Sequence, residues 1–203
     1  MGLYESCVLP WLLDHAMRNR ALAAYRDRLL AEARGGVLEI GVGAGLNLPR
    51  YGAAVARICA LDPSPALLRR AAPRADAAPC PVALVRGVAE RLPFADGSFD
   101  TLVMAWTLCS IRDPTAALAE MRRVLKPGGR LLFVEHGLAP EPGVARCQHV
   151  LTPAWRRLAG GCHLDRPMAE LIRDAGFHLD RFVAGYMAGP KPWTFMYEGV
   201  ASR

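Results

Sequence analysis

Three glycines at alternating positions follow an apolar run near the start of the chain. Gly41, Gly43 and Gly45 come directly after Val37–Ile40. Glycine has no Cβ, so its backbone can adopt a positive φ and a ligand can lie directly against the chain. Asp62 ends the next apolar run, at a separation that lets a carboxylate accept hydrogen bonds from the hydroxyls of a ribose. These residues predict a crevice that binds a nucleoside.

The spacing of the glycines excludes two common nucleotide-binding loops. The dinucleotide fingerprint needs a third glycine where this chain has Leu46 or Leu48, and a P-loop needs a Gly-Lys-Ser/Thr sequence that the chain lacks. A short-chain dehydrogenase would also need a Tyr-x-x-x-Lys pair. Neither Lys126 nor Lys191 has a tyrosine four residues earlier, so this class is excluded as well.

Alternating strands and helices must position these residues. Pro63 favours extended geometry at the strand end, and Ser64 can cap a helix that begins at Pro65. Strands separated by helices predict a parallel sheet with ligands beyond the carboxyl ends of its strands. We expect strands at 37–40, 57–61, 82–86, 100–105 and 130–134, helices at 18–33, 114–125, 145–159 and 166–175, a proline-rich connection at 73–81, and apolar runs at 179–183 and 194–200.

The motifs in residues 37–136 resemble those of the class I S-adenosylmethionine (SAM) methyltransferases, including enzymes that act on ubiquinone and menaquinone precursors. The motifs are Glu39-x-Gly-x-Gly-x-Gly, the strand-terminal Asp62, Gly87–Phe94, Phe99-Asp100 and Glu120–Gly129. The resemblance implies an α/β fold with a doubly wound, mostly parallel seven-stranded sheet and helices on both faces. The last two apolar runs would form an antiparallel pair at one edge.

The last third of the chain resembles a narrower group, the membrane-associated alkyl-thiol methyltransferases of animals and their shorter bacterial relatives. This likeness rests on Leu108-Cys109-Ser110, Glu135-His136, Gln148, Pro153-x-Trp155, residues 160–166 and Ala175-x-Phe177. The resemblance implies one SAM-methyltransferase domain over residues 1–203. Its parts would be an N-terminal helical lid (1–36), a SAM-binding core (37–136), and substrate-side helices with the final strand pair (137–203).

The resemblance also implies how SAM is held. Glu39 would hold the methionine amino group, the glycine loop would approach the methionine part, and Asp62 would take the ribose hydroxyls. Val88 stands where many relatives carry an aspartate, so that acceptor for the adenine amino group is expected to be missing. The expected cofactor-binding residues are Glu39, Gly41, Gly43, Gly45, Asn47, Asp62, Pro63, Ser64, Val88, Ala89, Glu90, Ala105, Trp106 and Leu108.

The expected reaction is methyl transfer from SAM to a small lipophilic nucleophile, with an alkyl thiol favoured over a phospholipid amine or a quinone precursor. Most of the acceleration can come from alignment, and a base is needed only for a nucleophile that arrives protonated. His136 is the first candidate base because it follows a strand beside the cofactor, and His149 and His163 come next. A structural role for His136 is an equal alternative. A non-catalytic SAM-binding sensor or scaffold is the alternative from another class.

No metal is expected. Cys147-x-His149 and Cys162-His163 do not have the spacing of a zinc finger or ribbon, and methyl transfer to sulfur does not require a metal. Cys109 is interpreted as a small packed hydrophobe. The six cysteines form no Cys-x-x-Cys pair and the chain shows no secretory signal, which predicts reduced thiols and a cytoplasmic protein.

Composition and charge narrow the class of partner. The chain has 203 residues, 52% of them hydrophobic, and its net charge of +6 comes from scattered arginines without a basic block. We therefore expect a small-molecule acceptor and no nucleic-acid partner. No segment is expected to span a membrane. Apolar residues near helical spacing predict a helix from Tyr4 to Met17 that acts as a lid over the cofactor, with an interfacial helix in contact with a membrane as the rival hypothesis.

Overall fold

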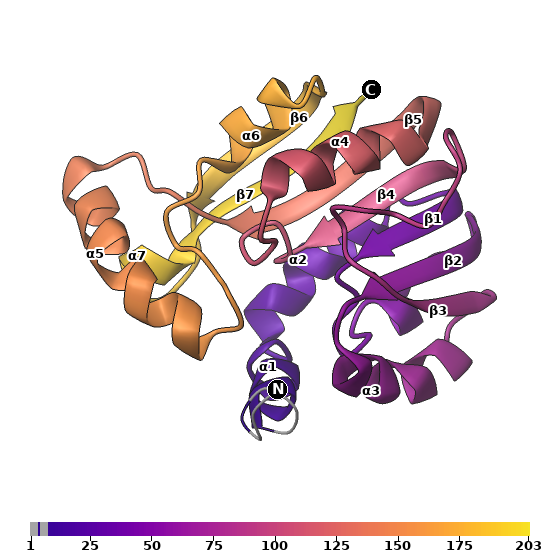
Figure 1. Cartoon of the computed structure of the whole chain (residues 1–203), viewed down its shortest axis with the longest axis horizontal. Helices are drawn as coiled ribbons and strands as arrows, with labels where there is room; N and C mark the ends of the chain where they lie inside the picture. Colours follow the sequence, from indigo (N-terminus) through magenta and orange to yellow (C-terminus); the bar gives the residue numbers. More distant parts are fainter. Residues whose placement is uncertain (1–3, 5–7) are drawn as a thin grey trace.

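The computed structural model describes Tyr4 and residues 8–203, and its described residues form a seven-stranded sheet flanked by helices (Figure 1). The strands are β1 (Gly35–Ile40), β2 (Val55–Asp62), β3 (Val82–Arg86), β4 (Phe99–Ala105), β5 (Leu125–His136), β6 (His178–Tyr186) and β7 (Phe195–Ser202). The helices are α1 (Leu9–Ala16), α2 (Arg20–Leu30), the 3-10 helix η2 (Leu48–Arg50), α3 (Pro65–Asp76), α4 (Pro114–Val124), α5 (Pro142–Leu158), α6 (Met168–Asp174) and α7 (Lys191–Thr194).

The strand order places β1 near the middle of the sheet. The order is β3-β2-β1-β4-β5-β7-β6, and the pairings among β1 to β5 are parallel. β7 is antiparallel to both β5 and β6 and forms the expected pair at one edge. Successive strands proceed in opposite directions from β1 and from β4, and open α/β sheets bind ligands at such a switch point. The doubly wound, mostly parallel fold is therefore confirmed.

Helices cover both faces of the sheet because neighbouring residues of a strand point to opposite sides. Leu38 and Leu102 belong to the core on the side of α4 and α6. Val37 and Val103 belong to the core on the other side, together with residues of α2 and α3. The central strands are buried on both faces, so their carboxyl ends have a fixed position from which to present a site.

Two of the boundaries that differ from the expected ones have a clear physical cause. α3 continues through Pro73 to Asp76, where a proline-rich connection was predicted. Pro73 lies on the exposed face of the helix, so water can solvate the carbonyl of Arg69 that the proline leaves without a partner. β5 begins at Leu125 rather than at residue 130, because Leu125 pairs with Phe99 before residues 126–129 bulge out of the ladder.

The N-terminal region is helical, in two shorter pieces than expected. α1 covers residues 9–16 of the predicted helix, and residues 5–7 of that prediction lie outside the described residues. α2 begins after Asn19, whose side chain accepts the N–H of Ala21 at 2.9 Å, and ends at Leu30. The Tyr4 hydroxyl donates to the carbonyl of Leu158 at 2.6 Å, which links the start of the chain to α5. In the described part of the chain, no helix is both long and apolar enough to cross a membrane.

Candidate active site

A cleft of about 610 Å³ lies at the carboxyl ends of β1, β2 and β4. Its walls come from the glycine loop after β1, the turn after β2, residues 88–90, and the segment that follows β4. Residues of α1, together with Arg26 of α2, close one side. Sites of this volume hold ligands the size of a nucleoside with a short side chain.

The glycine loop brings backbone close to the cleft. Gly41 has a φ of +69°, and a Cβ there would lie 2.4 Å from the Thr107 side chain. Gly43 has a φ of +57°, and a Cβ there would meet no heavy atom closer than 4.0 Å. The first glycine is thus required by packing and backbone conformation, whereas the second leaves open space in which a ligand can contact the main chain.

Asp62 is held by the two loops that flank it. Its Oδ2 accepts the N–H of Gly43 at 2.9 Å, and its Oδ1 accepts the N–H of Ser64 at 2.8 Å. Burial raises the pKa of Asp62, and the two backbone N–H groups act in the opposite direction. Each carboxylate oxygen keeps a lone pair for a further donor. The side chain can therefore accept two ligand hydroxyls from a fixed position.

Glu39 and Asn47 form a polar pair at the base of the glycine loop. Glu39 is 2% exposed, and it accepts hydrogen bonds from Asn47 Nδ2 at 2.8 Å and from the Tyr51 hydroxyl at 2.9 Å. Burial raises the pKa of Glu39 to about 7, although both hydrogen bonds oppose the shift. Asn47 Oδ1 is buried and has no hydrogen-bond partner among the described residues. A carboxylate and an unpaired amide oxygen at the cleft wall suit a ligand ammonium group, which would satisfy both.

Arg26 is a cleft residue that the sequence analysis missed. Its side chain is 4% exposed, and its guanidinium lies 4.7 Å from the ring centroid of Trp106. Burial lowers the pKa of Arg26 to about 10, so the group remains cationic at neutral pH. No carboxylate of the described residues forms a salt bridge with it, which leaves a buried cation facing the cleft. The sequence carried one signal that could have found Arg26: it lies three residues before the buried Leu29, at a position of the helix that faces the core.

The segment after β4 is fixed by a buried carboxylate. Glu135 is fully buried and accepts the N–H groups of Thr107 at 2.6 Å, Leu108 at 2.9 Å and Cys109 at 3.3 Å. Just before this turn, Trp106 adopts a φ of +52°, which a bulky residue takes only when its surroundings impose it. Glu135 stands in a motif noted in the sequence, but its role in holding this loop was not predicted.

α1 covers the cleft and is tied to the opposite wall. Leu9, Leu13 and Asp14 of α1 line the cleft. Asp14 is 6% exposed and forms salt bridges with Arg18 at 2.7 Å and with Arg74 of α3 at 3.0 Å. Arg74 also donates to the carbonyl of Ala44 in the glycine loop. The action of this helix as a lid over the cofactor stays a prediction.

Most of the expected cofactor residues meet in this cleft. Those that line it are Glu39, Gly41, Gly43, Asn47, Asp62, Pro63, Ser64, Val88, Ala89, Glu90, Ala105 and Trp106. Gly45 and Leu108 are not among the described residues that line the cleft. A Cβ on Gly45 would lie 3.0 Å from Leu48 and 3.1 Å from Ala71, so this glycine serves packing behind the loop. Leu108 is fully buried and its side chain belongs to the core.

The three candidate histidines lie outside the cleft lining. His136 is directed into the protein, and its Nε2 lies 3.0 Å from Cys162 Sγ. His149 Nδ1 lies 2.8 Å from Asp165 Oδ2 on the exposed side of α5, and His163 Nδ1 lies 3.8 Å from Asp165 Oδ1. His136 is thus not among the described residues that line the cleft, and its role as the base stays a prediction.

Comparisons with known proteins agree with the site. Residues 38–133 match a family model described as a methyltransferase domain. Human thiol S-methyltransferase TMT1B is 31% identical over 171 residues, which cover 78% of this chain and 70% of that protein. A phosphatidylethanolamine N-methyltransferase of Cereibacter sphaeroides is 39% identical over 145 residues, which cover 70% of each protein. The N-methyltransferase NodS of Bradyrhizobium japonicum WM9, solved with S-adenosyl-L-homocysteine, superposes with a TM-score of 0.71 at 19% identity, covering 96% of this chain and 92% of that chain.

The chain belongs to the SAM-dependent methyltransferases, as its motifs predicted, and it is an enzyme with SAM as its methyl donor. Its relatives include proteins named as thiol S-methyltransferases, and the matched stretches span between 34% and 70% of their lengths.

Proposed function

We propose that the enzyme methylates the sulfur of a small lipophilic thiol. The observation that carries this proposal is that no histidine or cysteine is among the described residues that line the cleft. A thiol with a pKa of about 8.5 is ~3% ionised at pH 7, whereas an alkylamine with a pKa of about 10.4 has ~0.04% of its free base. A thiol as acidic as a cysteine side chain therefore depends less on a catalytic base than such an amine does. The likeness to human thiol S-methyltransferase TMT1B supports the same choice.

SAM fits the polar groups of the cleft without leaving a buried charge unpaired. Asp62 would accept the ribose hydroxyls, and Pro63, Ser64 and the backbone at Ala89 would surround the adenine. The ammonium group would pair with Glu39 and satisfy Asn47 Oδ1, the acceptor that has no partner among the described residues. The methionine carboxylate would pair with the buried guanidinium of Arg26, although SAM as a whole also carries positive charges.

The chemistry then rests on alignment. SAM supplies an electrophilic methyl group on a sulfonium, and the acceptor sulfur donates an electron pair to that carbon as the old carbon–sulfur bond breaks. Glu135 would position the Trp106–Thr107 backbone at this end of the cleft through its three hydrogen bonds. α1 would exclude water from the reacting groups. Fixed geometry of this kind accounts for much of the acceleration in displacement reactions.

The acceptor end of the cleft favours an apolar substrate. Leu9 and Leu13 of α1, Ile111 and Ala159 line the cleft around Ser110 and Gly160. An alkyl or aryl thiol would bury its apolar part against these side chains, at about 25 cal/mol for each Å² removed from water. The substrate class is therefore a lipophilic thiol rather than a charged one.

A phospholipid amine is the second candidate. Val8, Trp11 and Leu12 of the α1 region are 45%, 54% and 42% exposed beside the cleft, and apolar side chains on such a helix suit the surface of a membrane. Flotation with liposomes tests this contact. Binding that is lost on deletion of residues 1–14 would favour an interfacial helix, and lost turnover without binding would favour the lid.

A product scan with labelled SAM tests the acceptor. The enzyme would be offered alkyl thiols, ethanolamine phospholipids in vesicles, and quinone precursors, with Asp62→Ala as the cofactor-binding control. We expect label in the thioether product, with a rate that rises with pH as the free thiol ionises. Label in the lipid amine or the quinone precursor, with none in any thiol, would contradict the proposal.

A further inference from the structure

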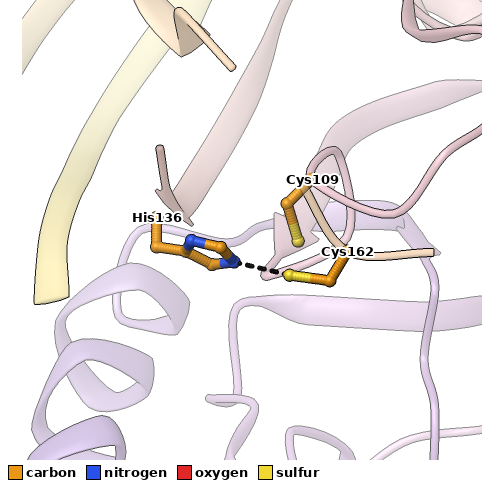
Figure 2. Close-up of side chains that lie close together, drawn as sticks. All are labelled: Cys109, His136 and Cys162. Atoms are coloured by element: carbon orange, nitrogen blue, oxygen red, sulfur yellow. Dashed lines mark hydrogen bonds between the residues drawn. The ribbon is translucent and has the colours of Figure 1, made fainter. Parts of the chain in front are cut away.

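Two cysteines and a histidine from separate parts of the chain meet behind the cleft wall. Cys109 follows β4, His136 ends β5, and Cys162 lies after α5. Figure 2 shows the two sulfur atoms and the histidine Nε2 directed toward one another. These three atoms all lie within 4.8 Å of one another. The two cysteine residues are only 2% and 9% exposed, so the cluster is shielded from bulk water.

The atoms of this cluster are of the type that zinc prefers. Thiolate sulfur and imidazole nitrogen are ligands of Zn²⁺, and a tetrahedral ion holds sulfur ligands ~3.8 Å apart, from bond lengths of about 2.3 Å. His136 Nε2 already lies 3.0 Å from Cys162 Sγ, so movements of about 1 Å suffice to seat an ion. His136 Nδ1 has no hydrogen-bond partner among the described residues, and Nε2 is the nitrogen that faces the sulfurs.

The Cys162 sulfur has a hydrogen-bond donor beside it, and a cation lies close to the cluster. The indole N–H of Trp155 donates to Cys162 Sγ at 3.3 Å. The Arg166 guanidinium donates to the carbonyls of Leu108 and Ile111, at 2.6 Å for Ile111, and so places a cation beside the cluster. Hydrogen bonds and charges in the second coordination sphere hold metal ligands in place in this way.

We propose that Cys109, His136 and Cys162 form a binding site for one Zn²⁺ ion. On binding, both thiols release their protons to solvent, and the two thiolates balance the charge of the ion. Three protein ligands leave the fourth position to a water molecule or to Ser110, whose hydroxyl lies 3.5 Å from Cys109 Sγ. No metal was expected from the sequence, because the neighbouring Cys and His residues lack zinc-finger spacing and methyl transfer to sulfur requires no metal. The set proposed here is instead brought together by the fold.

The site has a structural consequence for the cleft. Ser110 and Gly160 line the cleft, and each lies within two residues of a proposed ligand. A bound ion would tie the segment after β4, the end of β5 and the loop after α5 to one point. The inference does not depend on the identity of the acceptor, because it concerns the wall of the cleft rather than the reaction.

Zinc binding can be measured directly on the reduced 203-residue protein. We expect about one Zn²⁺ per chain by mass spectrometry of the metal content, and a Zn²⁺ affinity that competes with a chromophoric chelator. Cys162→Ser and His136→Gln should each weaken binding by more than about 100-fold, since even second-sphere changes cost 10- to 100-fold. Cys147→Ser, at an exposed cysteine of α5, is the matched control and should keep full binding. Replacement by Co²⁺ should give the intense visible absorption of a tetrahedral thiolate site in the parent and the control only.

Three outcomes would overturn the proposal. The reduced parent could fail to compete with the chelator for Zn²⁺. This outcome is read on the parent alone, so it does not depend on whether any variant folds. Zinc could bind equally well to the parent, Cys162→Ser and His136→Gln, which would place it elsewhere. The parent could be isolated with a Cys109–Cys162 disulfide and bind no Zn²⁺ after reduction, which would make the cluster a redox pair. Circular dichroism and SAM binding of each variant identify any that has not folded.

Discussion

Replacing Asp62 by alanine removes the carboxylate that would hold the ribose of SAM. Both of its oxygens are oriented by backbone N–H groups, at 2.9 Å from Gly43 and 2.8 Å from Ser64. Two hydrogen bonds to a charged group are worth about 3 to 6 kcal/mol at most, at about 1.5 to 3 kcal/mol each. Water solvates the same oxygens in the free enzyme, so we expect a net loss of about 1.5 to 3 kcal/mol.

The loss corresponds to a SAM Kd weakened by about 10- to 150-fold, which calorimetric titration can resolve. Asp76→Ala, at the exposed end of α3, is the matched control and should bind SAM as the parent does. A SAM analogue without the 2′-hydroxyl should bind more weakly to the parent, and Asp62→Ala should weaken it less than it weakens SAM, because one of the two hydroxyl contacts is already missing. An unchanged SAM affinity in a folded Asp62→Ala protein would refute the assignment of the crevice. The assignment would also be refuted if removing the 2′-hydroxyl weakened binding by the same factor in the parent and in Asp62→Ala.

Four further predictions follow from the cleft. Arg26→Met should weaken SAM by about tenfold while leaving decarboxylated SAM unaffected, because the guanidinium pairs only with the missing carboxylate; equal losses for both ligands by titration would contradict this. Burial raises the pKa of Glu39 to about 7, so the ionised fraction of Glu39 rises from ~9% at pH 6 to ~50% at pH 7. SAM affinity should therefore rise about fivefold between pH 6 and pH 7, and should not change with pH over this interval in Glu39→Gln. The same raised pKa means that the folded state holds the proton more tightly, so the free energy of unfolding should fall as pH rises from about 4.5 to 7, an effect that Glu39→Gln removes in denaturant titrations. Asp14→Asn should release α1 from Arg74 and speed SAM dissociation by about three- to tenfold in stopped-flow measurements, whereas Asp27→Asn, which breaks an exposed pair with Arg50, should not.

The sequence by itself determined the parts of the site that are local in the chain. The glycine loop and Asp62 act through one strand–turn–helix unit and the strand beside it, and their conformations follow from residue type: glycine for positive φ, proline and a capping serine after the carboxylate. The alternation of strands and helices likewise determined the parallel sheet, and the switch point placed the strand ends at one edge. Twelve of the fourteen expected cofactor residues line the cleft for this reason.

Only the tertiary structure decided which distant residues face the same space. Arg26 enters the cleft because α2 packs across β5 and β7 and directs one buried position toward Trp106. His136 faces Cys162 and is not part of the cleft lining, although its position at a strand end predicted that it would reach the cleft. In both cases the sequence gives the position of the residue along its own helix or strand. The angle at which a second element packs across that helix or strand is set by contacts between segments far apart in the chain. The Cys109–His136–Cys162 cluster exists for the same reason, since no two of its members are neighbours in sequence.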